Sequence, residues 1–450
     1  MKQKKILIYS HQGTACIDLR IQSQAVFLKN MGYKVLVLDK NPFGKYDDRL
    51  YKQHNVNIKP IYVKSSLILK ALRYANAGRR LVARKLRSVR YPISMICLVV
   101  TILSEALYLV AILFYVAILR PILQLILYNA PFYNPYDSYY KTILRGIKDF
   151  APDVIIARDI SGNAAFYKQK IDPSVVIIND LHEIFYLQGE SVNLIAKFVQ
   201  EEDFKYTNGI ICVNDLIADK YYNTWKSRGL AVPIPNVICN QMLENMQSPQ
   251  FKTTEKVNFL YHGGYSRMRN SAIYLINIWD KLDKKAVLNI RLLNYTTADS
   301  QYLLEEVHKT KSFAEKRIVI LETTFGGVEQ EVVSTIDMFD VGIDDTAVHM
   351  DNQYRLASAN RLSTYLHSGL ALMTTNGLFS SYIVNKSQAG VVFDYQNPDD
   401  MIEKINNLCQ NPEQLLQMRK NAYNFAKTEF NYEVYGKNLV EMIEKLSTKI

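Results

Sequence analysis

Three side chains capable of acid–base chemistry, Asp180, His182 and Glu183, follow the short apolar run Val176–Ile178. If that run is a buried parallel strand, it delivers them at its carboxyl end, where open α/β sheets bind their ligands. A histidine in that place can donate a hydrogen bond to a hydroxyl group or to a developing charge. We therefore predict Asp180, His182 and Glu183 as catalytic residues. The alternative is a structural His–Asp pair that caps the next helix.

The segment after the apolar run Asn258–Tyr261 has the residue types of a phosphate-binding turn. Gly263 and Gly264 would free backbone N–H groups to approach a diphosphate, and Arg267 and Arg269 can neutralise its charge. We predict that these four residues bind an anionic ligand. The alternative is an ordinary turn between a strand and a helix.

A third candidate is the start of a predicted helix that ends at Gly369. The positive end of its dipole lies near Ser358 to Asn360, points into the expected cleft and favours an anionic ligand. The alternative is a plain helix–glycine–strand connection.

The fourth candidate lies between the first apolar run and the first predicted helix, and it comprises Gly13, Thr14, Asp18 and Arg20. Gly13 would let the turn pass close to a ligand. The alternative is an ordinary strand-to-helix turn.

Parallel strands are needed to hold these residues, and short β-branched runs do alternate with helical patterns along the chain. In the first half the expected strands are Ile6–Tyr9, Lys34–Leu38, Ile58–Val63, Asp153–Ala157, Val175–Ile178 and Gly209–Val213. In the second half they are Asn258–Tyr261, Val287–Leu292, Arg317–Leu321, Asp340–Ile343, Ala371–Thr374 and Gly390–Phe393. Pro60 would confine its strand to a sheet edge, and helix Leu19–Met31 would end at Gly32.

The expected fold class is therefore α/β, with two doubly wound Rossmann-like domains that face each other across a cleft. The first domain is expected over residues 1–238 and the second over residues 256–428. A linker is expected at 239–255 and a closing helix within 429–450.

A basic and then apolar segment interrupts the first domain. Residues 49–90 hold twelve of the chain's 54 Lys and Arg and no Asp or Glu, which accounts for the net charge of +11. Residues 91–129 are nearly uncharged, and the stretch from Ile96 to Leu119, with Glu105 as its one ionisable group, is long enough to span a bilayer. This combination predicts that residues 49–129 bind an anionic membrane surface.

The insert, at about residues 64–140, cannot be a single membrane pass, because strands on both sides of it belong to one sheet. Three interpretations stay open: helices in the membrane plane, a re-entrant hairpin, or a buried helical layer. No element suited to reading bases is present, so we expect no nucleic-acid partner. The five scattered cysteines have no metal-binding spacing and indicate a reduced, cytoplasmic protein.

Taken together, the motifs resemble those of family 4 glycosyltransferases of the GT-B fold, of the membrane-associated bacterial type. The resemblance covers nearly the whole chain except the insert. The matching segments are Asp18-x-Arg20 with Gly32–Val35, Asn179–Glu183, Pro235–Val237, His262–Gly264 with Arg269, and Asn360–Gly369.

The resemblance implies a hexosyltransferase that uses a nucleotide-sugar donor and retains the configuration of the transferred sugar. It also implies that the enzyme needs no metal or other cofactor. It places His182 beside the reacting sugar, with Asp180 and Glu183 as its neighbours. The implied donor-binding residues are Gly263, Gly264, Arg267, Arg269, Asn360, Arg361 and Thr364. The implied acceptor-side residues are Gly13, Thr14, Asp18 and Arg20.

With the basic insert, the resemblance further implies a lipid-linked or cell-surface glycan precursor as acceptor, hence a role in polysaccharide biosynthesis. The enzyme would be peripheral or monotopic at the cytoplasmic face of the cell membrane. Two departures bear on the donor side: Leu356 and Thr364 stand where the family has a pair of glutamates. A degenerate GT-B subunit that assists a partner transferase, or another GT-B enzyme such as a sugar-nucleotide epimerase, therefore remain alternatives.

Overall fold

The computed structural model describes residues 3–10, 18–40, 48–61, 137–158, 171–181, 204, 206–219, 230–263, 265, 272–292, 298–321, 332, 334–345, 356, 358–394 and 396–448. The chain divides into two compact units, one of Met1–Pro60 with Phe150–Ile450 and one of Ile61–Asp149. Both sheets belong to the first unit. Of the second unit, the structure describes Ile61 and the helix α6 (Asp137–Phe150) as far as Asp149.

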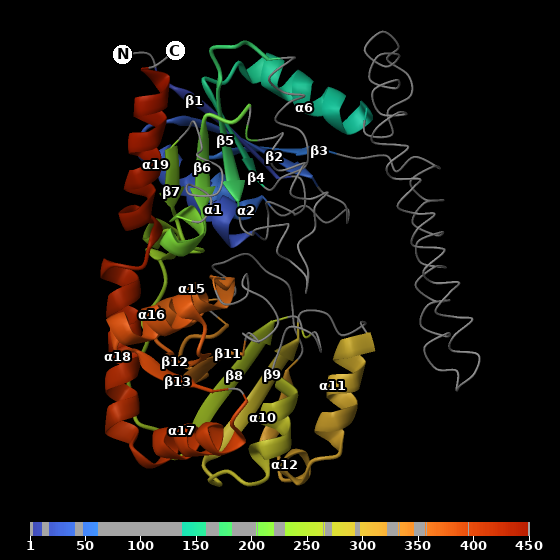
Figure 1. Ribbon diagram of the computed structural model, residues 1–450, viewed down its shortest axis with the longest axis vertical. Coiled ribbons are helices and arrows are strands. Elements are labelled where there is room, and N and C mark those ends of the chain that lie inside the picture. Colours follow the sequence, from blue (N-terminus) through green and yellow to red (C-terminus); the bar gives the residue numbers. More distant parts are fainter. Residues whose placement is uncertain are drawn as a thin grey trace, which may run out of the picture. The chain divides into compact units, whose positions relative to one another are not determined.

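The first sheet has the strand order β3-β2-β1-β4-β5-β6-β7 (Figure 1). Its strands are β1 (Lys5–Ser10), β2 (Lys34–Lys40), β3 (Asn57–Ile61), β4 (Val154–Arg158), β5 (Val176–Leu181), β6 (Gly209–Cys212) and β7 (Leu230–Pro233). The strands from β2 to β7 pair in parallel. Parallel strands covered by helices are buried on both faces, which is why they are continuous apolar runs.

The sheet contains the six strands predicted for the first half, with β3 at its edge as Pro60 required. The prediction missed β7, a four-residue strand that ends in Pro233 at the opposite edge. Three strands precede the insert and four follow it in the same sheet. Within the described part of the chain no helix is long and apolar enough to cross a membrane, and residues 91–129 lie outside that part.

Two helices of the first half are α1 (Leu19–Asn30) and the short α2 (Arg49–Gln53). Asp18 caps α1 by accepting hydrogen bonds from the backbone of Arg20 and Ile21, both at 3.1 Å. Gly32 has a φ of +90°, and ends the helix where the sequence predicted.

The second sheet has the strand order β10-β9-β8-β11-β12-β13, and all of its pairings are parallel. Its strands are β8 (Val257–Gly263), β9 (Ala286–Leu292), β10 (Ile318–Leu321), β11 (Val341–Asp344), β12 (Ala371–Thr375) and β13 (Gly390–Phe393), as predicted to within two residues. Its helices are α10 (Ala272–Trp279), α11 (Ala298–His308), α12 (Lys311–Ala314), α15 (Asn360–His367), α16 (Leu378–Ser387), α17 (Pro398–Gln410) and α18 (Pro412–Thr428).

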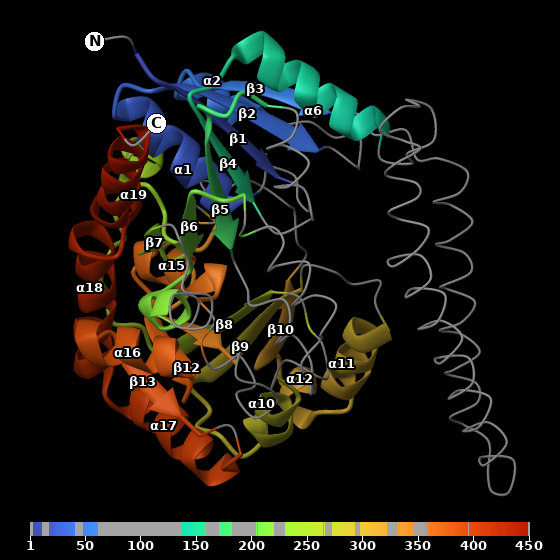
Figure 2. The same cartoon turned by 45° about the horizontal axis from the view of Figure 1, so that its top comes forward.

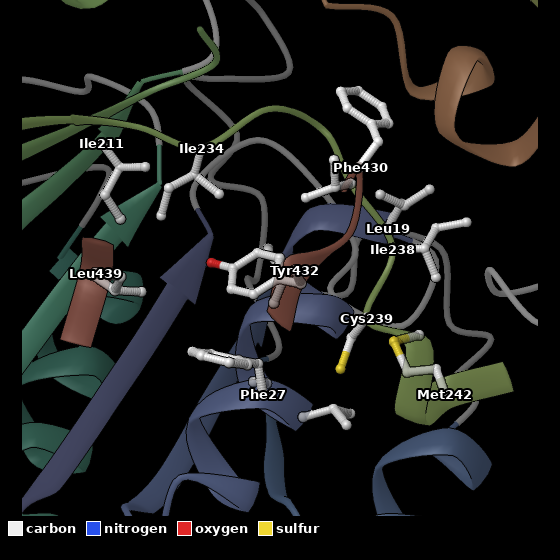
Figure 3. Packing of buried hydrophobic residues seen from close by; sticks show 14 of the residues in the cluster. Leu19, Phe27, Ile211, Ile234, Ile238, Cys239, Met242, Phe430, Tyr432 and Leu439 are labelled. Atoms are coloured by element: carbon white, nitrogen blue, oxygen red, sulfur yellow. The ribbon is translucent and has the colours of Figure 1, made fainter. Parts of the chain in front are cut away.

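The last helix, α19 (Tyr432–Ser447), returns to the first sheet and packs on α1 and β7 (Figures 1 and 2). The rings of Phe27 and Tyr432 lie 5.3 Å apart within a buried apolar cluster (Figure 3). A Cβ atom at Gly436 would lie 2.5 Å from the Phe27 ring, so the glycine permits this close approach.

The segment expected to be a linker is closely packed where it begins. Ile238, Cys239 and Met242 are buried, and residues Asn240–Leu243 form a short 3-10 helix. The Glu433 carboxylate of α19 accepts hydrogen bonds from the backbone N–H groups of Asn240 and Gln241, at 3.0 and 3.1 Å. The linker is therefore attached to the closing helix.

Candidate functional site

The carboxyl ends of β8 and β11 and the first turn of α15 meet around one side chain, Arg361. Its Nε lies 3.3 Å from Asp344 Oδ1, and its Nη1 lies 3.1 Å from Asp345 Oδ1. The same Nη1 donates to the backbone carbonyl of His262 at 3.3 Å, and the guanidinium carbon lies 5.8 Å from the centre of the Tyr261 ring. Arg361 therefore holds the ends of two strands together.

The charge of Arg361 is already matched by carboxylates. Burial disfavours the guanidinium charge, but Asp344 and Asp345 outweigh that effect and raise the pKa of Arg361. A cation held between two carboxylates is a poorer counter-charge for a diphosphate than a free one would be. The geometry thus gives the predicted donor residue Arg361 a clear role in arranging the strand ends.

His262 lies next to this group and pairs with Arg291 of β9 in the strand register. Burial, followed by the charges of Arg291 and Arg361, lowers the pKa of its imidazole to about 3. The ring is therefore neutral at physiological pH. Its Nδ1 is buried and has no hydrogen-bond partner among the described residues, so a neutral ring nitrogen lies at the end of β8.

The start of α15 has features that suit an anion. Its N-cap, Ala359, has no side chain to satisfy the first backbone N–H groups, and Asn360 is exposed. Ser358 is 5% exposed, and its Oγ has no hydrogen-bond partner in the described part of the chain. Thr364, predicted to bind the donor, is instead only 2% exposed and lies on the buried face of the helix.

Gly263 ends β8 with a φ of +150°, a backbone conformation that side chains disfavour. A Cβ atom there would lie 3.5 Å from Nη1 of Arg361, so the strand end passes close to the guanidinium group. Gly264, Arg267 and Arg269 lie outside the described residues, and their roles stay predictions.

At the first sheet, three strand ends are aligned by the pairing register. Ser10 of β1 pairs with Arg158 of β4, which in turn pairs with Asp180 of β5. Arg158 forms an ion pair with Asp18, the cap of α1. The carboxyl ends of β1, β4 and β5 therefore share one edge of the sheet, and Asp18 has a capping role beside it.

Arg20 and Asp180 form an ion pair in the interior, where each is 1% exposed. The Arg20 Nε donates to both carboxylate oxygens, at 2.8 and 2.9 Å, and Nη2 lies 2.6 Å from Oδ1. Asp180 was predicted as catalytic and Arg20 as acceptor-side. Their burial and mutual pairing give both side chains a structural role, and the catalytic and acceptor-side roles stay predictions.

Gly13, Thr14, His182 and Glu183 lie outside the described residues. For these four the predicted roles are unchanged, and the structure places only the strand end that precedes His182. Leu181, directly before it, ends β5 and is fully buried.

Two asparagines of the first domain hold the segment before α15. Asn214 donates from Nδ2 to the backbone carbonyl of Leu356, and Asn236 donates from Nδ2 to that of Ser358 at 2.6 Å. Inside the helix, Ser363 Oγ accepts a hydrogen bond from the backbone of Ile238 at 3.1 Å. The start of α15 is thus attached to residues of the first domain.

The ion pairs of Asp344, Asp345 and Arg158 were not predicted. The structure pairs both Asp344 and Asp345 with Arg361. The signal for Arg158 was its place directly after the apolar run of β4. Asp344 and Asp345 have the same signal, because they stand at the end of the apolar run of β11.

A cavity of about 90 Å³ lies at the opposite edge of the second sheet, near the starts of β8 and β11. Val257, Asp340 and Arg419 are among its lining residues. Ligand pockets are typically a few hundred Å³ or more, so this cavity is too small for a sugar nucleotide. In the described ranges no group of three or more His, Cys, Asp or Glu could hold a metal ion.

No protein-family model matches the sequence, and neither does any curated protein. Solved structures do match. A sucrose-phosphate synthase from Thermosynechococcus elongatus is 11% identical, with 100% of both chains covered and a TM-score of 0.67. A glycosyltransferase from Rickettsia africae is 10% identical over 99% of both chains, with a TM-score of 0.62.

A third match is HepE from Anabaena in complex with UDP, at 12% identity, 98% of this chain, 100% of that chain and a TM-score of 0.61. The same protein matches in complex with UDP-glucose, at 9% identity, 98% of this chain, 99% of that chain and a TM-score of 0.60. At such identities the likeness establishes the fold. The chain therefore has the GT-B fold, with two parallel-stranded α/β domains.

Proposed function

We propose that this chain is a glycosyltransferase that moves a sugar from a nucleotide-sugar donor to a lipid-linked or cell-surface glycan precursor. The observation that carries the proposal is the junction of β8, β11 and the start of α15 around Arg361, in a fold shared with glycosyltransferases. The UDP and UDP-glucose complexes of HepE support a nucleotide-sugar donor.

In the proposed reaction the bond between the anomeric carbon and the diphosphate oxygen breaks. A bond from the anomeric carbon to an acceptor hydroxyl oxygen forms, and the hydroxyl proton passes to an oxygen of the departing diphosphate. The backbone N–H groups at the start of α15, with Arg267 and Arg269, would stabilise the departing diphosphate without a metal ion. His182 would hydrogen-bond the reacting sugar, and we propose that configuration is retained.

The acceptor class and the location are proposed from charge. Twelve basic residues and no acidic ones in residues 49–90, next to an apolar run, suit an anionic membrane surface. We propose that they hold the enzyme at the cytoplasmic face of the membrane, where a lipid-linked acceptor would be present.

A second candidate function is a non-catalytic GT-B subunit that assists a partner transferase. Two observations favour it: Leu356 and Thr364 replace the family's glutamates, and Thr364 is buried. A subunit of this kind would release no nucleotide from any donor.

A donor screen in the presence of membrane extract tests the proposal. Release of a nucleoside diphosphate is measured for each of several nucleotide-sugars, with the wild-type chain and with His182→Ala and Arg269→Ala. We expect one donor to be turned over and both variants to lose most of that turnover while remaining folded. Lys309→Ala, which removes a cation from the exposed end of α11, is the control and should be fully active. No release with any donor would favour the non-catalytic subunit.

A further inference from the structure

The structure links the end of β5 to the start of α15 through one asparagine side chain. We propose that Asn236 is a positioning residue, which sets the first turn of α15 and thereby the affinity for the donor diphosphate. The effect on affinity rests on the proposed function, whereas the effect on α15 does not.

The orientation of the Asn236 amide is determined by its two partners. Its Oδ1 lies 3.4 Å from Nη1 of Arg20, which can only donate, and its Nδ2 lies 2.6 Å from the carbonyl oxygen of Ser358, which can only accept. The side chain is 6% exposed. If the amide were flipped, its N–H groups would face the N–H groups of Arg20, and its oxygen would face the carbonyl oxygen of Ser358. The orientation described here is therefore strongly favoured.

Arg20 is itself held in place on both sides. Asp180 binds its Nε and Nη2, while its Nη1 also donates to the backbone carbonyls of Ile234 and, at 3.2 Å, Pro235. The guanidinium therefore fixes the backbone on which Asn236 stands as well as the amide itself. Asp180 lies two residues before the predicted catalytic His182, so the connection starts at the acceptor-side strand end.

The start of α15 has no side-chain cap, so the Asn236 contact fixes the residue directly before its N-cap. Ala359 provides no side-chain cap, and Ser358 directly precedes it. The carbonyl of Ser358 is bound by Asn236, and the adjacent helix bond from the Leu362 N–H to the Ala359 carbonyl is 3.2 Å long. Movement of Ser358 would therefore change the direction of the first N–H groups of the helix.

The variant Asn236→Asp separates the two halves of the connection. A carboxylate keeps the acceptor for Arg20 and adds charge complementarity to it, but it cannot donate to the Ser358 carbonyl and repels it. Binding is measured by calorimetry with UDP, GDP, ADP and CDP. For whichever of these the wild type binds, we expect about tenfold weaker binding in the variant, as the loss of one buried hydrogen bond implies.

A matched control is Asn431→Asp at the junction of α18 and α19. Asn431 is buried in the same way, its Oδ1 accepts from the backbone of Val434 at 3.0 Å, and its Nδ2 donates to the carbonyls of Ala426 and Lys427, both at 2.9 Å. This substitution also keeps an acceptor and loses a donor to backbone carbonyls. It should lower thermal stability but leave nucleotide affinity unchanged.

Amide hydrogen exchange provides the readout that does not depend on nucleotide binding. In Asn236→Asp, the amides of residues 362–364 should exchange faster than in the wild type, while those of β12 should not. Asn431→Asp should change the exchange of neither group.

Exchange at residues 362–364 that stays at the wild-type rate in Asn236→Asp would overturn the proposal, as would unchanged affinity for a nucleotide that the wild type binds. If the wild type binds none of the four nucleotides, the proposed donor function fails, and exchange still decides the positioning role. Asn236→Ala, which removes both contacts without adding charge, serves if the aspartate variant does not fold.

Discussion

The ring of Tyr365 lies directly against Gly342, and a Cβ atom at Gly342 would come within 2.3 Å of two ring carbons. The Tyr365 hydroxyl accepts a hydrogen bond from the backbone of His262 at 3.2 Å and lies 3.4 Å from the carbonyl oxygen of Ile343. One buried side chain of α15 thus contacts both β8 and β11. This contact aligns the helix with the strand ends that form the candidate donor site.

The first prediction concerns this contact. Gly342→Ala should lower the free energy of unfolding by about 1–3 kcal/mol, because the added methyl overlaps a ring that cannot move away. Urea unfolding measures the loss. In the double variant with Tyr365→Leu, the cost of Gly342→Ala should be clearly smaller than in the wild type. Additive costs would show that the ring is not the cause.

The second prediction concerns Arg361. Arg361→Met removes the cation that lies between Asp344 and Asp345, and we expect a loss of about 3–5 kcal/mol in the free energy of unfolding, as for other broken buried ion pairs. Arg361→Lys should lose less, because it keeps the charge but not the planar fork that reaches both carboxylates. An exposed ion pair contributes at most about 1 kcal/mol. If the free energy of unfolding of Arg361→Met lies within about 1 kcal/mol of the wild-type value, the structural role of Arg361 is wrong.

The strands were predictable because each is a short apolar run between turn residues, and parallel strands buried on both faces need that pattern. The exception is β7, where Leu230–Pro233 is too short and too close to a proline to stand out. The partners of Arg20 and Arg361 were not predictable in the same way. Asp180 is 160 residues from Arg20 in the sequence, and only the folded sheet brings the two side chains together.

The third prediction concerns pH. Burial lowers the pKa of His367 to about 3, and its Nδ1 donates to the carbonyl of Ser363 at 2.8 Å. The pKa of His262 is also lowered to about 3. In the unfolded chain both imidazoles take up a proton below about pH 6.5. The unfolded state therefore binds more protons between about pH 6.5 and 3, and stability falls as the pH falls through that range.

Each of these histidines should contribute a slope of about 1.4 kcal/mol per pH unit to the free energy of unfolding once the pH is well below 6.5. Urea unfolding from pH 7 to pH 5 measures the total slope. His367→Gln should reduce the total slope by the amount that one buried histidine contributes, about 1.4 kcal/mol per pH unit. His308→Gln, on the exposed end of α11, removes no buried imidazole and serves as the control. An unchanged slope in His367→Gln would contradict the predicted cause.

The fourth prediction concerns the basic segment, which can be tested without removing any part of the fold. Changing Arg79, Arg80, Arg84 and Arg87 to Gln removes four positive charges, each worth about 1 kcal/mol at an anionic lipid surface. Sedimentation with vesicles of phosphatidylserine and phosphatidylcholine should show binding of the wild type, and a much weaker binding of the variant. Binding should also fall as the salt concentration rises, because salt screens the attraction.

The matched control for the fourth prediction changes Lys281, Lys284, Lys309 and Lys311 to Gln, which removes the same charge from an exposed part of the second domain. If membrane binding depends on net charge alone, the two variants should lose it equally. If it depends on the basic segment, the control should bind like the wild type. The second outcome is expected, because residues 49–90 contain twelve basic residues and no acidic residue to offset them. A variant without the four arginines that still binds strongly would shift the anchoring role to the apolar residues 91–129.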